Sequence, residues 1–132
     1  MIADTNLLLR ALDGDPGAQG RAARQRIGQA RDSDQPLTVL AVTLLEVVYV
    51  LESANAGYGW DRDAVAGCVE AIIDDPGLDV EHAGALRTAV ASYRTLSIDL
   101  HDCLLDALAQ QRATKVLSFD DDLRRLGNHQ QP

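Results

Sequence analysis

Four acidic residues stand where helices are expected to begin: Asp4, Glu46, Asp102 and Asp120. Asp4 and Asp120 each follow a short apolar run directly, and Glu46 follows an apolar stretch that ends at Val42. In an open parallel α/β sheet, ligands bind beyond the carboxyl ends of the strands. Carboxylates brought to that edge would be oxygen ligands for a hard cation such as Mg²⁺ or Mn²⁺, and such a cation suggests phosphodiester chemistry.

Each acid also has a purely structural interpretation as a helix cap, because side-chain oxygens at a helix start accept hydrogen bonds from free backbone N–H groups. The capping candidates are Asp4, Thr43 paired with Glu46 in a capping box, Asp99, and Asp120 or Asp121. A cap contributes about 1 kcal/mol. Two carboxylates about 4–5 Å apart repel by roughly 3–4 kcal/mol at an effective dielectric constant near 20. If the four acids converge, a divalent ion is therefore expected between them.

The elements that would carry these acids alternate between strands and helices. Short apolar runs predict strands at residues 1–3, 37–42, 78–80 and 115–119. Helical spacing of apolar residues and turn signals predict helices at 5–12, 18–31, 43–56, 61–74, 81–94, 97–112 and 121–126. Strands that alternate with helices favour an α/β fold in which helices cover both faces of a parallel sheet.

The length and composition of the chain favour one domain over residues 1–132, with residues 128–132 expected to fray. Cys68 and Cys103 do not form a C-x-x-C pair, so a disulfide scaffold is not expected and a reducing, cytoplasmic compartment is the simplest interpretation. We expect no secretory signal and no membrane-spanning segment.

The charge balance matters for any nucleic-acid partner. Twenty acids against twelve basic residues give a net charge of −8. Phosphate contacts need local positive charge, which this total does not provide. An arginine cluster offers it locally, and the alternative is a solvated helix face: Arg10, Arg21, Arg24, Arg26 and Arg31.

Four segments, in this order, resemble the PIN-domain ribonucleases of the VapC toxin type. They are Asp-Thr-Asn-Leu-Leu at 4–8, the glutamate-bearing segment 43–51, Asp-Leu-His-Asp-Cys-Leu-Leu at 99–105, and Val-Leu-Ser-Phe-Asp with Asp122 at 116–122. Together they cover essentially the whole chain. The resemblance implies a three-layer α/β/α PIN-like fold with a short, mainly parallel central sheet.

The resemblance also implies which residues do the chemistry. Asp4, Glu46, Asp102 and Asp120 would be the catalytic acids that hold Mg²⁺ or Mn²⁺. Asn6 and Ser118 would be polar supports, and Asp122 would add charge at the rim of the site. Two features depart from the family pattern: the first strand is short, and Asp106, expected to be solvated, lies one turn after Asp102.

The leading hypothesis is a metal-dependent endoribonuclease that cleaves RNA and acts as the toxin of a toxin–antitoxin pair. The resemblance implies a homodimer and a protein antitoxin, whose apolar segment and basic residue would fill an acidic groove. One alternative is a non-catalytic binding or dimerisation module in which the acids only cap helices. Another is a phosphatase or phospho-acceptor with Asp4 or Asp120 as the nucleophile. The only lysine, Lys115, precedes the last predicted strand and so lies at the wrong end for that chemistry.

Overall fold

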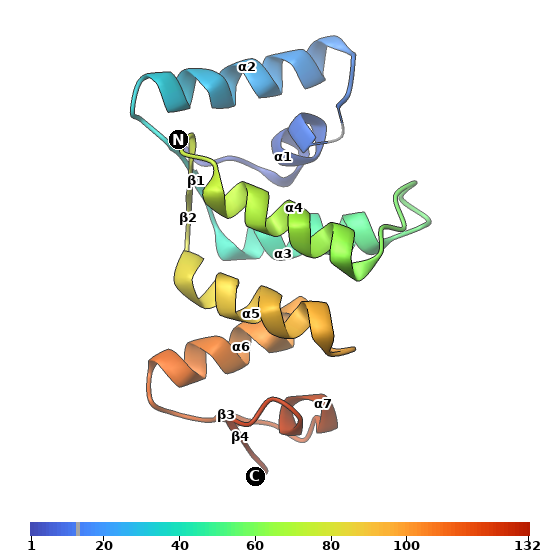
Figure 1. The fold of residues 1–132 in the computed structure, drawn as a ribbon, viewed down its shortest axis with the longest axis vertical. Coiled ribbons are helices and arrows are strands. Elements are labelled where there is room, and N and C mark those ends of the chain that lie inside the picture. Colours follow the sequence, from blue (N-terminus) through green and yellow to red (C-terminus); the bar gives the residue numbers. More distant parts are fainter. Residues whose placement is uncertain (13) are drawn as a thin grey trace. The chain divides into compact units, whose positions relative to one another are not determined.

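The structure, a computed structural model, describes residues 1–12 and 14–132. The described chain forms two compact units, Met1–Glu81 and His82–Pro132 (Figure 1). That the whole chain acts as one domain stays a prediction. Among the described residues, no helix has the length and apolar character needed to cross a membrane.

The first unit combines four helices with one pair of parallel strands. Its elements are α1 (Thr5–Leu12), α2 (Ala18–Asp32), β1 (Leu37–Val39), α3 (Ala41–Glu52), α4 (Arg62–Asp74) and β2 (Leu78–Val80). β1 pairs with β2 in register Leu37 to Leu78, and Ile2 forms an isolated parallel bridge to Thr38. Helix α1 packs against both α2 and α3, and α3 packs against α4. The parallel pairing confirms the expected α/β class.

Helix α3 begins earlier than the sequence suggests. The predicted strand 37–42 ends at Val39, and the helix starts at Ala41 with Leu40 as its N-cap residue. The backbone N–H of Ala41 donates to Glu81 Oε1 at 3.1 Å, so a carboxylate from the end of β2 caps this helix. The capping box predicted for Thr43 and Glu46 is therefore wrong, because both residues already lie inside the helix.

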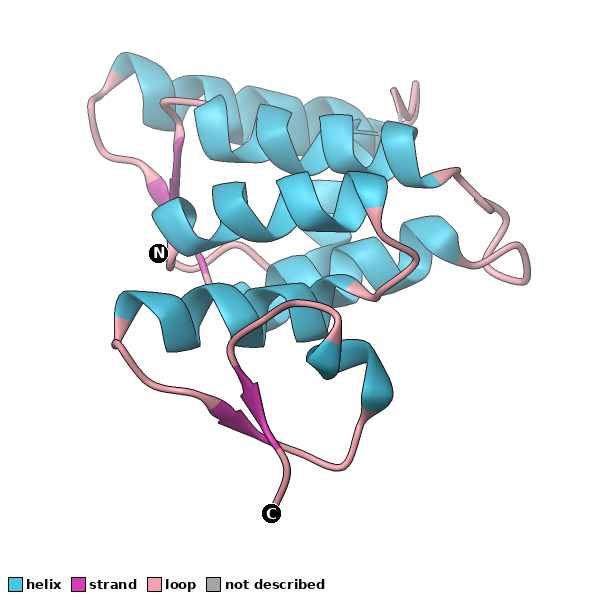
Figure 2. Ribbon diagram, turned by 60° about the horizontal axis from the view of Figure 1, so that its bottom comes forward, coloured by secondary structure: helices cyan, strands magenta, loops and turns pink. Residues whose placement is uncertain are grey.

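The second unit packs two long helices together and adds a small strand pair. Its elements are α5 (Ala83–Thr95), α6 (Leu100–Gln111), β3 (Val116–Leu117), α7 (Asp121–Arg124) and β4 (His129–Gln130). β3 and β4 are parallel, with Val116 opposite His129. Figure 2 shows how short the strand pairs of both units are beside the helices.

The end of the chain is held in place by Asp106. This carboxylate is buried, with 9% of the residue exposed, and its Oδ1 accepts a hydrogen bond from the Asn128 N–H at 3.0 Å. The expectation that Asp106 is solvated is wrong, and residues 129–130 of the tail that was expected to fray form strand β4. The sequence pattern does not reveal this contact because its partners are 22 residues apart.

Candidate metal centre

Asp4 stands at the point where the first strand-like segment gives way to α1. The N–H of Ala3 donates to Thr38 O at 2.8 Å, which fixes this segment beside β1. Asp4 Oδ1 accepts the N–H of Leu7 at 2.8 Å, as an N-cap residue does. The side chain is exposed. Capping therefore uses one oxygen of this carboxylate and leaves the other available to a ligand.

Glu46 reaches the same region from α3. It is exposed, and its Oε2 accepts a hydrogen bond from Thr5 Oγ1 at 2.8 Å. Thr5 follows Asp4 directly, so this bond ties Glu46 to the start of α1. The sequence pattern does not indicate Thr5 as a supporting residue, although Thr5 stands between Asp4 and Asn6 in the Asp-Thr-Asn segment. Asn6 itself lines a hollow that Asp4 also lines.

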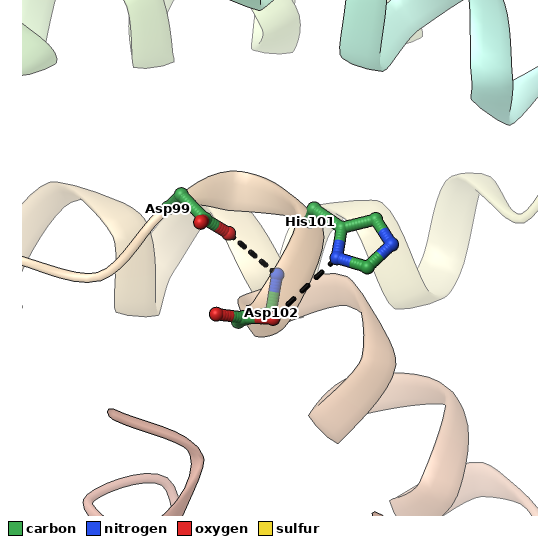
Figure 3. Close-up of side chains that lie close together, drawn as sticks. All are labelled: Asp99, His101 and Asp102. Carbon is green, nitrogen blue, oxygen red and sulfur yellow. Dashed lines mark hydrogen bonds and ion pairs between the residues drawn. The ribbon is translucent and has the colours of Figure 1, made fainter. Parts of the chain in front are cut away.

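In the second unit, Asp99 and Asp102 stand together at the start of α6. Asp99 caps the helix, since its Oδ1 accepts the Asp102 N–H at 2.8 Å. His101 Nδ1 lies 3.4 Å from Asp102 Oδ1 (Figure 3). One ligand atom from each of these three residues lies within 4.8 Å of the others. The exposed ring of His101 turns toward Asp102, although the two residues are neighbours on the helix.

The charge of Asp102 is disfavoured in the folded protein. Burial raises the pKa of this carboxyl group above its usual value, and the negative charges of Asp99 and Asp120 raise it further. The hydrogen bond from His101 acts in the opposite direction without cancelling the rise in pKa. A half-buried carboxylate that feels two like charges is the electrostatic setting in which a cation binds.

Asp120 follows β3 and caps the short helix α7. Its Oδ1 accepts the N–H of Asp122 at 2.9 Å, and its own N–H donates to Ser118 Oγ at 3.0 Å. Ser118 thus holds the Asp120 backbone, and its supporting role at a metal site stays a prediction. Asp122 lies 3.5 Å from Arg125 Nη1, so part of its charge is balanced within α7.

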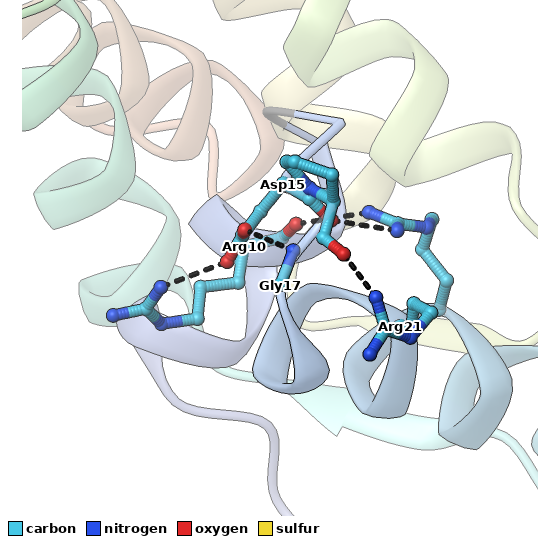
Figure 4. A network of polar contacts seen from close by, with 6 residues as sticks. Arg10, Asp15, Gly17 and Arg21 are labelled. Carbon is cyan, nitrogen blue, oxygen red and sulfur yellow. Dashed lines mark hydrogen bonds and ion pairs between the residues drawn. The ribbon is translucent and has the colours of Figure 1, made fainter.

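The arginines near α2 are mostly engaged inside the first unit. Arg10 forms an ion pair with Asp15 at 2.9 Å (Figure 4). Arg21 and Arg24 donate to the backbone carbonyls of Pro16 and Asp15. The Gly17 N–H and the Arg10 side chain both hold the pKa of Asp15 below its usual value. The turn predicted at 13–17 is described from Gly14 onward, and Asp13 lies outside the described residues.

Arg31 is also committed to a structural contact. Two nitrogens of its guanidinium donate hydrogen bonds to the Asp75 carboxylate, with Nη2 2.9 Å from Oδ2. The hydrogen bonds and charge of Asp75 raise the pKa of Arg31. Four of the five arginines considered for phosphate contacts therefore fasten turns and helices of the protein itself.

The four predicted acids thus form two pairs, Asp4 with Glu46 in the first unit and Asp102 with Asp120 in the second. All four are carboxylates, a donor set that suits Mg²⁺ or Mn²⁺ better than Zn²⁺. That both pairs converge on one ion stays a prediction. The fold and these side chains define an α/β protein with three carboxylates at helix starts and a fourth, Glu46, inside α3.

Comparison with known proteins identifies the family. The model of the PIN domain matches residues 1–128. The chain is 29% identical over 127 residues to a VapC ribonuclease of Aquifex aeolicus (strain VF5), covering 96% of this chain and 91% of that protein. The chain belongs to the PIN-domain family.

Proposed function

We propose that this protein is a metal-dependent endoribonuclease and the toxin of a toxin–antitoxin pair. The observation that carries the proposal is the Asp102 carboxyl group, which is half-buried beside Asp99 and whose pKa is raised by burial, by Asp99 and by Asp120. A divalent cation would relieve that repulsion. Family membership and the similarity to a VapC ribonuclease support the substrate class.

Each proposed ligand has a defined task in this scheme. Asp4, Glu46, Asp102 and Asp120 would hold Mg²⁺ or Mn²⁺ through their free oxygens, while Thr5 and Ser118 fix two of them in orientation. When bound, such an ion lowers the pKa of water and stabilises charge on the phosphoryl oxygens. Single-stranded or looped RNA fits best, because its unpaired bases and flexible backbone can enter a groove.

The helix-cap geometry permits a clean test by substitution to asparagine. Asn caps helices about as well as Asp, so Asp4→Asn and Asp120→Asn remove a negative charge while leaving an acceptor for the helix. Asp102 lies inside α6, where Asp99 is the cap, so Asp102→Asn removes a charge without touching a cap. We expect each variant to lose RNA cleavage in Mg²⁺ or Mn²⁺, by about 100-fold or more, since an oxygen ligand and its charge are lost.

Asp61→Asn is the matched control. Asp61 caps α4 by accepting the Ala64 N–H at 2.8 Å and is not a proposed ligand. This variant should cleave as the parent does. If Asp4→Asn cleaves as fast as the parent, a contaminating nuclease is responsible and the assignment fails.

The alternative without catalysis predicts no response to divalent ions. Binding to the folded state raises stability by about 2.7 kcal/mol when the ion is present at 100 times its Kd. A thermal melt in millimolar Mn²⁺ should therefore show a higher Tm for the parent and a smaller rise for Asp102→Asn. An unchanged Tm of the parent would favour the binding-module alternative.

The partners and compartment are also part of the proposal. We infer an antitoxin as protein partner, a homodimer, and a cytoplasmic location, which suits the two buried cysteines Cys68 and Cys103, since they are not joined in a disulfide. Val42 and Tyr49 are 69% and 75% exposed on α3, and apolar side chains of this kind suit a protein contact. Production of the chain alone should arrest growth, and normal growth would contradict the toxin assignment.

A further inference from the structure

A hollow of about 400 Å³ opens beside Asp4, between α1 and α2. On α2 its wall is one helical stripe, spaced three, four and seven residues apart: Gln19, Ala22, Ala23 and Arg26. On the other side it is lined by Asp4, Asn6, Leu7 and Arg10. The two alanines leave space in the middle of the stripe, and the longer polar side chains stand at its ends.

Among the residues that the structure describes, no carboxylate pairs with Arg26, the second arginine that lines the hollow. Arg10 is paired with Asp15, whereas the contact recorded for Arg26 is from Nη2 to Met1 Sδ at 3.9 Å. A thioether sulfur is a weak acceptor and does not neutralise a guanidinium. The residue is half-buried, so its stem is held by packing. The contact with Met1 places the guanidinium where the chain approaches Asp4.

Asp4 and Arg26 line the same hollow without forming an ion pair with each other. Because the two side chains are not bonded to each other, a ligand can lie between them and interact with both. A phosphodiester fits this description, because its oxygens bind a cation held by the carboxylate and accept hydrogen bonds from the guanidinium.

We propose that Arg26 binds an RNA phosphate in this hollow and so positions the backbone beside Asp4. This rests on the proposed ribonuclease function and adds a positioning residue to it. It also addresses the net charge of −8, because a guanidinium that lines the same hollow as Asp4, with no described carboxylate paired to it, gives a phosphate positive charge at that place.

The test compares Arg26→Gln with Arg26→Lys and with Arg21→Gln. Glutamine keeps much of the stem and removes the charge, so the fold should be retained, which a melting curve verifies. Arg21 lies on the same helix, donates to the Pro16 carbonyl and does not line the hollow, so it is matched for charge and element. Binding of a fluorescently labelled single-stranded RNA is measured by anisotropy in Ca²⁺ over a series of salt concentrations, with intact RNA verified on a gel.

We expect Arg26→Gln to weaken RNA binding by about 10- to 100-fold, the scale of a charge-assisted hydrogen bond to phosphate. The plot of log affinity against log salt should lose about 0.7 from its slope, as one phosphate contact of a single strand requires. Arg26→Lys should keep the slope, and Arg21→Gln should change neither quantity.

Binding is measured apart from cleavage, so the two proposals fail separately. If the parent protein binds RNA but does not cleave it, the proposed ribonuclease function is refuted, and the binding data still test the role of Arg26. An unchanged affinity and slope for Arg26→Gln overturn the role of Arg26. An equal loss for Arg21→Gln also overturns it, since that result means diffuse charge attraction. A parent that does not bind RNA overturns the inference as well.

Discussion

Asp106 should control the order of the last strand and, through it, the loop that carries Asp120. Its Oδ1 holds the Asn128 N–H, Asn128 O accepts the Val116 N–H at 2.6 Å, and Gln130 O accepts the Ser118 N–H at 3.1 Å. Ser118 Oγ in turn accepts the Asp120 N–H. Removing the Asp106 carboxylate should therefore loosen a chain of contacts that ends at a proposed metal ligand.

The size of the effect follows from the burial of this contact. A net hydrogen bond to a charged group contributes about 1.5–3 kcal/mol, and an N–H group left without a partner adds a desolvation cost if it remains buried. Asp106→Ala should thus lower the free energy of unfolding by about 2–3 kcal/mol. Asp106→Asn keeps an oxygen acceptor of similar shape and should cost about 1 kcal/mol.

Urea unfolding measures the total loss of folding free energy, and amide hydrogen exchange shows which segments lose stability. We expect faster exchange at the Asn128 and Ser118 amides in Asp106→Ala, with the amides of α5 much less affected. RNA cleavage should fall in parallel, because Asp120 is less well held. If exchange at Asn128 and Ser118 is the same in Asp106→Ala as in the parent, Asp106 does not anchor this segment and the reasoning is refuted.

Two further predictions concern the acids directly. Asp102→Asn should stabilise the metal-free protein at neutral pH. A carboxyl group whose pKa is higher in the folded than in the unfolded protein lowers the stability once it is ionised in both. The stability gained by the substitution should therefore appear as the pH rises from the unfolded pKa near 3.9 through the folded pKa, and it should be absent below both. Melting curves between pH 3 and 8 check this sign, and a gain present only at acid pH would contradict it. Thr5→Val removes the hydrogen bond that orients Glu46. It should raise the Mn²⁺ concentration that gives half-maximal cleavage by about 10-fold, a typical cost for residues that orient a ligand. Thr5→Ser should restore it, and equal Mn²⁺ requirements in Thr5→Val and the parent would show that Thr5 does not position Glu46.

The helices were well predicted from sequence because their signals are local. Helix α4 starts after Asp61 and β2 spans Leu78–Val80, as the cap residue and the apolar run indicate. The start of α3 was misplaced because the carboxylate that caps it comes from Glu81, 40 residues along the chain. No pattern within residues 37–46 carries that information.

The candidate site was predicted unevenly for the same reason. The acids themselves are visible in the sequence, since each stands in a recognisable family segment. The contacts that hold them are tertiary: Thr5 reaches Glu46 across 41 residues, and Asp106 reaches Asn128 across 22. Residue type and spacing identify the carboxylates, but only the packed chain shows which hydroxyl or amide orients each one.

Capping and metal binding were treated as rival explanations of these acids, and the structure makes them compatible. In Asp4, Asp99 and Asp120, Oδ1 accepts a hydrogen bond from a backbone N–H at a helix start. An asparagine would satisfy that cap equally well, but it would offer no second charged oxygen. The positive end of a helix dipole stabilises a nearby carboxylate by about 0.3–1 kcal/mol, well below the roughly 3–4 kcal/mol by which two carboxylates 4–5 Å apart repel. A helix start can therefore hold one such acid in place, while two or more that converge need a cation or a raised pKa. This difference is why Asp61→Asn, at an isolated cap, should be silent and the same substitution at Asp4 should not.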